Sequence, residues 1–251
     1  MPTPLTLFSL PCAGASAVMY LRWRRKLPFW VRIQPIELPG RGGRLHEASE
    51  KTFDMLAARL CDELEMNPPQ RYAFFGHSMG ALLAYRITHH LRARMRPLPI
   101  ALLVSACAAP SRQDWKRYAD KNSDASLIAD LRKQAGTPEE VFQNPELLSM
   151  TLGLLGADYR ICASFRHEEL PPLPIPIHVF SGRADEIHIS RLKAWQLESI
   201  GSFSMDWFDG GHFFLRYHEE AFLPILVQRL AESSGLAESS VEAPHAALAS
   251  A

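Results

Sequence analysis

The chain has 251 residues, of which 47% are hydrophobic and 22% charged, and it carries 27 basic and 27 acidic side chains. This length and composition are typical of one globular α/β enzyme and do not require a second domain. The balanced charge argues against nucleic acid or a membrane surface as the partner.

Short apolar runs alternate with longer helical patterns along the chain. We predict strands at 5–10, 31–38, 71–76, 100–106, 175–182 and 203–208. We predict helices at 16–27, 50–66, 78–95, 190–200 and 218–232. Nearly all-apolar strands are typical of a parallel sheet that is covered on both faces. The alternation of strands with helices therefore predicts a doubly wound α/β fold with a mostly parallel central sheet.

Two segments depart from this alternation. The segment from about 110 to 170 is too long for one crossover, and its helical patterns are not interrupted by a clear β run. We expect it to form a helical lid rather than another strand–helix unit of the sheet. After about residue 233 the sequence is small and polar, which predicts a disordered tail at 234–251. The expected organisation is one domain over residues 1–233.

The cysteines and the N-terminal segment bear on the compartment. Cysteines stand at positions 12, 61, 107 and 162, and no two form a CxxC pair that would indicate a metal or redox site. The stretch "LTLFSLPCAGASA" has the small residues of a signal peptide, but its first basic residue is Arg22 and Pro11 ends the apolar run early. No stretch approaches the roughly 20 apolar residues that span a bilayer. We therefore expect a cytoplasmic protein with free thiols.

The stretch "YAFFGHSMGALLAY" contains a Gly-x-Ser-x-Gly motif formed by Gly76, Ser78 and Gly80. Such a motif can occur by chance, so only the secondary structure around it can indicate a catalytic serine. A predicted strand precedes Ser78, and a predicted helix follows at once. This arrangement is typical of the nucleophile elbow of α/β-hydrolases, in which small neighbours let the backbone turn sharply at the serine.

A serine hydroxyl needs a base, and in this fold the acid and the base follow the serine in that order. "VFSGRAD" places Asp185 directly after a predicted strand, and "WFDGGHFFL" places His212 directly after the next one. Two glycines before His212 permit the tight loop that a catalytic base needs. Ser78, Asp185 and His212 are thus the predicted catalytic triad.

Some alternatives remain at this point. Glu186 can replace Asp185 as the acid, because either carboxylate can orient an imidazole. Four other histidines are alternatives to His212 as the base: His77, His188, His218 and His245. The first lies inside the elbow and is expected to point away from a base position. His188 lies too near the acid, His218 lies within a helical pattern, and His245 lies in the tail.

The oxyanion hole of this fold combines two backbone N–H groups. One is expected from Met79, which follows the nucleophile at the start of a helix. The second is expected from Ala13, in the small-residue loop after the first strand. Its neighbours Cys12 and Gly14 are alternatives, and the Cys12 side chain is expected to be a buried small hydrophobe.

Five motifs in chain order resemble those of the type II thioesterases, the stand-alone editing enzymes of nonribosomal peptide and polyketide synthesis. They are "LFSLPCAGASAVMYLRW", "IELPGRGGR", "FFGHSMGALLAYR", "SGRADE" and "GGHFFL". The resemblance covers residues 5 to 230 and assigns the triad to Ser78, Asp185 and His212, with Ala13 in the oxyanion loop. Cys12 and Ala15 depart from the usual aromatic residue and glycine, but neither change removes a backbone N–H. The nearest association is with the stand-alone thioesterases of siderophore clusters such as that of pyochelin.

The resemblance implies a substrate class and a partner. Type II thioesterases release acyl or aminoacyl groups from the phosphopantetheine arms of carrier domains, and the reaction needs no metal or bound cofactor. This chain has no convincing carrier motif, so the carrier is expected on a partner, and a monomer is the default expectation. The basic segments at 22–26 and 92–96 can meet an acidic carrier, although solvated helix faces are the favoured interpretation.

Two other functions fit parts of the same pattern. A small-molecule carboxylesterase or lipase would use the same triad and lid. A non-catalytic binding module would retain the hydrolase shell, but an intact triad argues against it.

Overall fold

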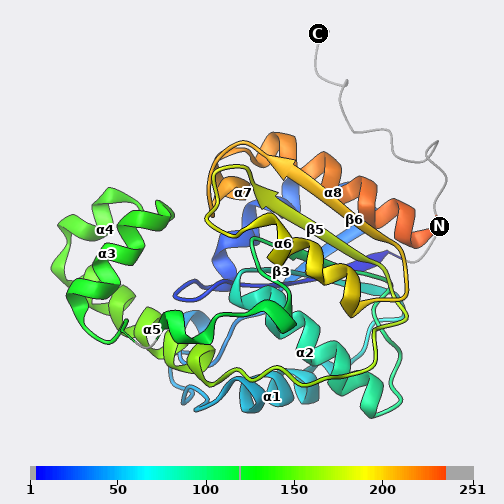
Figure 1. Ribbon diagram of the computed structural model, residues 1–251, viewed down its shortest axis with the longest axis horizontal. Helices are drawn as coiled ribbons and strands as arrows, with labels where there is room; N and C mark the ends of the chain where they lie inside the picture. Colours follow the sequence, from blue (N-terminus) through cyan, green and yellow to red (C-terminus); the bar gives the residue numbers. More distant parts are fainter. Residues whose placement is uncertain (1–3, 119, 236–251) are drawn as a thin grey trace, which may run out of the picture.

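The computed structural model describes residues 4–118 and 120–235. Its centre is a six-stranded parallel sheet with the strand order β2-β1-β3-β4-β5-β6 and helices on both faces (Figure 1). The strands are β1 (Leu5–Leu10), β2 (Val31–Pro35), β3 (Tyr72–His77), β4 (Leu102–Ser105), β5 (Ile177–Gly182) and β6 (Phe203–Phe208). The predicted α/β fold with a parallel sheet is confirmed.

The helices form two layers and one projecting group. The α-helices are α1 (Phe53–Glu65), α2 (Met79–Ala93), α3 (Asp124–Gln134), α4 (Glu139–Gln143), α5 (Pro145–Ser164), α6 (Ile189–Lys193), α7 (Phe214–Tyr217) and α8 (Glu219–Ser234). The 3₁₀ helices are η1 (Ala17–Arg25), η2 (Gly42–Arg44), η3 (Pro110–Arg112), η4 (Trp115–Tyr118) and η5 (Ala194–Glu198). One buried cluster joins α1 and α2 to one sheet face, and a second joins η1 and α8 to the other.

Three predicted elements differ in form. The helix expected at 16–27 is the 3₁₀ helix η1, whose two buried aromatic residues, Tyr20 and Trp23, lie on the same side of a three-residue turn. The helix expected at 190–200 divides into α6 and η5. The strand expected at 31–38 is shorter and ends at Pro35, although the Ile36 N–H still donates to Ser9 O of β1 at 2.9 Å.

The sheet changes its direction of winding between β1 and β3, which are neighbours in it. The chain leaves β1 toward η1 on one face and leaves β3 toward α2 on the other. In open α/β sheets, the crevice outside the carboxyl ends of two such strands is the usual ligand site. This geometry brings the loop after β1 beside Ser78, at the start of α2.

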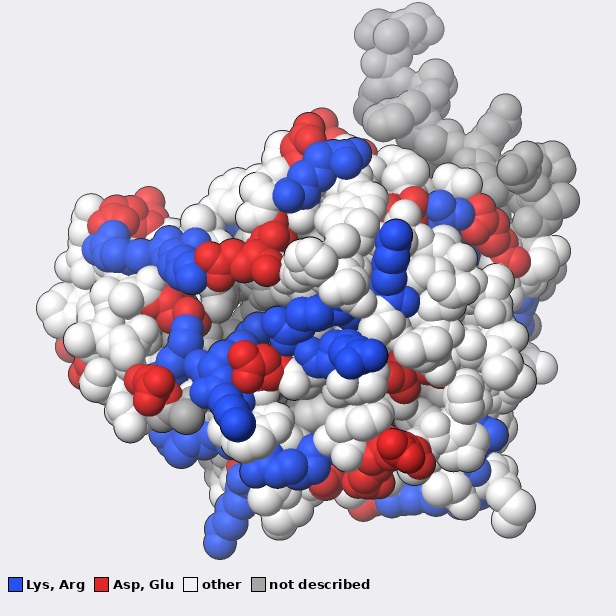
Figure 2. Space-filling model, viewed as in Figure 1, with Lys and Arg blue, Asp and Glu red and all other residues white. Residues whose placement is uncertain are grey.

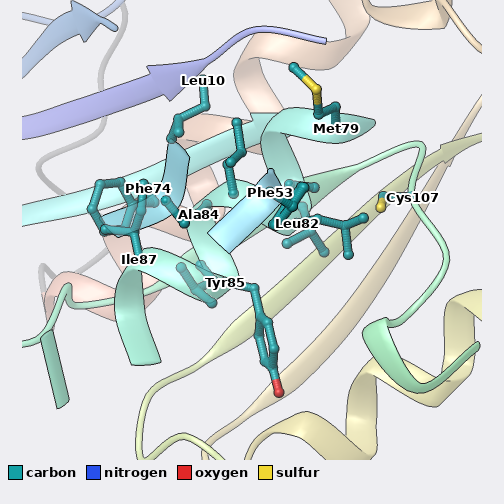
Figure 3. Packing of buried hydrophobic residues seen from close by; sticks show 14 of the residues in the cluster. Leu10, Phe53, Phe74, Met79, Leu82, Ala84, Tyr85, Ile87 and Cys107 are labelled. Atoms are coloured by element: carbon teal, nitrogen blue, oxygen red, sulfur yellow. The ribbon is translucent and has the colours of Figure 1, made fainter. Parts of the chain in front are cut away.

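Helix α2 is buried on nearly all sides, which makes it a rigid support for the residue that precedes it. Figure 3 shows side chains of α2 packed with Leu10 of β1, Phe53 of α1 and Phe74 of β3. Gly80 in its first turn lies so close to β1 that an added Cβ would collide with the carbonyl oxygen of Leu10. The small residue two positions after the serine is therefore required by the contact between α2 and β1.

We call residues 110–170 the lid segment. Its described residues contain η3, η4, α3, α4 and α5 and add no strand to the sheet. In Figure 1, α3 and α4 project away from the sheet, whereas α5 returns toward α1. Of the tail predicted at 234–251, Ser234 still belongs to α8 and Gly235 caps that helix. Residues 236–251 lie outside the described residues.

Several cations of the two basic segments pair within the molecule. Arg22 and Lys26 both contact Glu219, at 3.2 and 2.6 Å. Arg94 contacts Asp62 at 2.6 Å. These pairs favour solvated faces over a carrier surface. Within the described ranges, no helix has both the length and the hydropathy to cross a bilayer.

Two glycine substitutions test the contact between α2 and β1. We expect Gly80→Ala to lower the melting temperature and the activity, because the new methyl group must push α2 away from the backbone of Leu10. Gly153→Ala is the matched control. Gly153 is exposed within α5, and a Cβ there meets nothing within 4 Å. Its replacement should stabilise the helix by up to about 1 kcal/mol. Equal melting temperatures for the two variants in thermal unfolding would contradict this account.

Candidate active site

Ser78 stands between β3 and α2 in a conformation that few non-glycine residues adopt. Its φ is +52° and its ψ is −115°. Such backbone strain costs about 1–3 kcal/mol and persists only where the surroundings enforce it. Here the Ser78 N–H donates to the carbonyl oxygen of Ser105 at 2.8 Å, which ties the turn to β4. An added Cβ at Gly76 would collide with the backbone of Gly80, so both motif glycines are required by close contact.

Asp185 and His212 form a hydrogen-bonded pair in the loops after β5 and β6. His212 Nδ1 lies 2.9 Å from Asp185 Oδ2, and the two side chains are 12% and 5% exposed. A carboxylate at Nδ1 fixes the imidazole orientation and leaves Nε2 free to act as a base. In the described part of the chain, no hydrogen bond joins Ser78 Oγ to His212. Catalytic hydrogen bonds of unliganded enzymes are often long and shorten only when substrate binds.

The loops that carry this pair are joined by their backbones. Arg183 N–H donates to Phe208 O at 2.8 Å, and Ala184 N–H donates to Gly210 O at 2.9 Å. Gly210 has a φ of +97°, and a side chain at Gly182 would collide with this second loop. The glycines before His212 therefore allow its loop to lie directly against the loop that carries Asp185.

The alternatives for the acid and the base occupy other positions. The Glu186 side chain is 74% exposed and pairs with Lys133 at 2.9 Å, so it does not orient the imidazole. His188 caps the short helix α6 and contacts Ser190. His218 lies between α7 and α8, and His245 falls outside the described residues.

His77 differs from expectation, because its ring lies beside His212 rather than away from it. The two ring centroids are 5.1 Å apart. His77 is fully buried at the end of β3, and its Nδ1 lies 3.0 Å from Ser105 Oγ. Burial, with a smaller contribution from His212, holds the pKa of His77 well below its usual range. A neutral His77 adds no positive charge beside the imidazolium that forms when His212 accepts a proton.

The expected oxyanion donors can be compared by what their N–H groups contact. Neither the Met79 N–H nor the Ala13 N–H donates to another described residue. Gly14 N–H donates to Asp158 Oδ2 at 2.7 Å, which removes Gly14 from the alternatives. Cys12 is only 4% exposed, and burial raises the pKa of its thiol to about 12, as expected for an inert side chain.

A buried ion pair that sequence reasoning missed supports the oxyanion loop. Asp158 of α5 accepts hydrogen bonds from Arg41 at 2.7 and 2.6 Å, in addition to the bond from Gly14. The two charged side chains are 0% and 2% exposed. Arg41 also donates to Ala15 O at 3.0 Å. One carboxylate of the lid segment therefore fixes the loop that carries the Ala13 N–H. In the sequence the two residues are 117 positions apart, and only Asp158 lies within an apolar helical stretch, so no local pattern pairs them.

A cavity of about 620 Å³ lies between the lid segment and the loops of the acid–base pair, and Asp185 and His212 belong to its lining. The turn after α3 closes over α7, where Tyr217 Oη donates to Ala135 O at 2.7 Å and Arg216 donates to Gly136 O. Within the described ranges, no three His, Cys, Asp or Glu side chains are arranged to hold a metal ion.

Comparison with known proteins identifies the family. The family model described as "Thioesterase domain" matches residues 5–230. The protein named linear gramicidin dehydrogenase LgrE, from Brevibacillus parabrevis, is 33% identical over 228 residues, which are 89% of this chain and 87% of LgrE. Its name specifies another reaction, whereas the matching family model is that of thioesterases.

Two solved structures are similar over nearly the whole chain. The type II thioesterase BorB from the borrelidin biosynthetic cluster is 36% identical, with a TM-score of 0.82 over 92% of this chain and 94% of BorB. YbtT, the type II thioesterase of the yersiniabactin NRPS/PKS pathway, is 27% identical, with a TM-score of 0.79 over 92% of this chain and 95% of YbtT.

The chain therefore belongs to the thioesterase family, with the α/β-hydrolase fold and the serine-type chemistry of that family. Within it, the chain is a type II editing thioesterase of nonribosomal peptide and polyketide pathways.

Asp185→Asn tests the acid assignment. An amide can hold the imidazole in the wrong tautomer, so we expect kcat to fall about 10³-fold or more while the fold is kept. Glu186→Gln is the matched control, because Glu186 is the adjacent exposed carboxylate, and its kcat should stay within about twofold of the wild type. A larger loss in Glu186→Gln than in Asp185→Asn would transfer the role to Glu186.

Replacement of the buried ion pair tests whether Asp158 positions the loop that carries the Ala13 N–H or only stabilises the fold. Asp158→Asn alone should destabilise the fold by about 3–5 kcal/mol, because Arg41 keeps an uncompensated buried charge. The double variant Arg41→Met with Asp158→Leu removes both charges and should restore the melting temperature. Its kcat should remain about tenfold or more below the wild type, with little change in KM, because the Gly14 N–H has lost its acceptor. Full kcat in the stable double variant would show that the oxyanion loop does not need this carboxylate.

Proposed function

We propose that the protein hydrolyses acyl and aminoacyl thioesters from the phosphopantetheine arms of carrier domains, with Ser78 as nucleophile, His212 as base and Asp185 as the orienting acid. The main support is the 2.9 Å contact between His212 and Asp185, in loops joined to each other beside a strained serine turn. The relatives of the chain act in pathways that build on carrier domains, which favours a carrier-bound thioester over a free ester.

The proposed reaction has two steps, acylation of Ser78 and hydrolysis of the acyl-enzyme. His212 Nε2 takes the Ser78 proton while Ser78 Oγ attacks the thioester carbonyl, and the C–S bond then breaks as the proton passes to the leaving sulfur. The free arm thiol departs and an acyl-Ser78 ester remains. Water then attacks this ester with His212 again as base, and a carboxylic acid and free Ser78 result. A thiol has a pKa near 8.5, so its thiolate leaves readily and needs little assistance.

The developing oxyanion needs donors that are already in place. We assign this role to the N–H groups of Met79 and Ala13, which no other described residue occupies. The Met79 N–H stands at the first position of α2, where the helix dipole favours negative charge. A fixed donor of this type contributes about 3–4 kcal/mol to transition-state stabilisation in serine hydrolases.

Further properties belong to the same proposal. We assign the catalytic domain to residues 1–233, with residues 110–170 as its lid, and we expect a monomer whose carrier comes from a partner. The four cysteines of the chain are free and buried, in keeping with a cytoplasmic location. A siderophore pathway remains an expectation, supported by the similarity to a thioesterase of the yersiniabactin pathway.

Ser78→Ala tests the function directly. Acyl-loaded carrier proteins would be incubated with wild type or variant, and the free carrier would be followed by mass spectrometry. We expect the variant to lose about 10⁴-fold or more of the hydrolysis rate, because no other group can form the acyl-enzyme. Ser190→Ala, which changes an exposed serine of α6, should retain the wild-type rate.

Two further outcomes separate the alternative functions. A clear preference of the wild type for simple oxygen esters over carrier thioesters would favour a carboxylesterase. Failure of a fluorophosphonate probe to label Ser78 in the wild type would favour a binding module and overturn the proposal.

A further inference from the structure

The cavity beside His212 has an unusual share of cations in its lining. Four basic side chains contribute to it: Arg117, Lys121, Lys133 and Arg191. The two arginines come from different elements, since Arg117 belongs to η4 of the lid segment and Arg191 to α6. Figure 2 shows basic side chains along the hollow that separates the lid segment, at the left, from the rest of the molecule.

The two lysines of this group are neutralised by carboxylates of the same lining. Lys121 pairs with Asp130 of α3. Lys133 pairs with Glu186 at 2.9 Å. These pairs leave no free carboxylate for the two arginines, because the remaining acid of the lining, Asp185, is hydrogen-bonded to His212.

Arg117 and Arg191 have no carboxylate partner among the described residues. Arg117 stacks its guanidinium on the Tyr118 ring, 4.7 Å from the ring centroid. Arg191 donates its Nε–H to the carbonyl oxygen of Arg112 at 3.0 Å, which leaves the two terminal nitrogens of its fork available. A guanidinium is always charged, and its planar fork matches carboxylate and phosphate oxygens.

We propose that Arg117 and Arg191 form a subsite for an anionic oxygen group carried by the thioester substrate. Two sources share this chemistry, namely the phosphodiester of a phosphopantetheine arm and a carboxylate at the far end of an acyl group. Asp185 and His212 of the candidate triad belong to the same lining, so the inference rests on the proposed function. The partly enclosed cavity strengthens the attraction between such an anion and the two cations.

Four substrates separate the two sources. Acetyl and malonyl thioesters would each be prepared on pantetheine and on 4′-phosphopantetheine, so that phosphate and carboxylate vary independently. Arg117→Gln and Arg191→Gln would be compared with the wild type in kcat and KM. Lys116→Gln and Lys193→Gln are the matched controls, because they remove an exposed cation from the same two elements without changing the cavity lining.

We expect each arginine variant to raise KM about tenfold or more for substrates that carry the recognised anion, with kcat and the melting temperature nearly unchanged. The KM for acetyl-pantetheine, which has neither anion, should be the same in the arginine variants as in the wild type. Both lysine variants should keep the wild-type KM for all four substrates. An increase in KM for the two substrates that carry the phosphate assigns the subsite to the phosphopantetheine arm. An increase for the two malonyl substrates assigns it to the acyl group.

Other results overturn the inference. An equal increase in KM for all four substrates, or no increase for any of them, would show that the arginines do not recognise an anion of the substrate. A wild type that hydrolyses none of the four would instead count against the proposed function, which keeps the two failures distinguishable.

Discussion

The buried contact between Arg41 and Asp158 joins three parts of the chain on which the site depends. Asp158 belongs to the lid segment, Arg41 to the loop after β2, and Gly14, which donates to the same carboxylate, to the loop after β1. A charge that loses its partner at such depth costs several kcal/mol. The three parts are therefore stable only together. The base of the lid segment and the oxyanion loop form one structural unit, although the rest of the lid segment projects from the body.

The sheet supplies the second constraint. Its winding changes between β1 and β3, so the crevice at their carboxyl ends opens beside Ser78. Helix α2 is buried nearly all round, and the strained turn at its start is fixed by contacts with β1 and β4. The loops that carry Asp185 and His212 follow β5 and β6, which lie next to each other at one edge of the sheet. Ser78 and the hydrogen-bonded pair of Asp185 and His212, the proposed triad, thus follow different strands of one sheet.

The sequence allowed the prediction of most of this framework, because buried parallel strands are continuous apolar runs and Ser78, Asp185 and His212 each follow one. What it could not reveal depends on contacts between distant segments. Nothing in the local pattern pairs Asp158 with Arg41, since only the folded lid segment brings them together. The position of His77 was predicted wrongly for a similar reason: the loop that places His212 beside it comes from the far end of the chain.

The turn after α3 is attached to α7 by two solvent-exposed hydrogen bonds, from Tyr217 and Arg216. At about 1 kcal/mol of net stabilisation each, these bonds together contribute about 2 kcal/mol. A free-energy difference of about 2 kcal/mol corresponds to about 3% of the molecules having both hydrogen bonds broken. A docking partner that touched α3 or α4 would need only a few favourable contacts to reverse this ratio. Exposure of the cavity would also break the ion pair between Lys133 of α3 and Glu186, so a carrier of the proposed kind that bound α3 or α4 would shift one equilibrium that includes all three contacts.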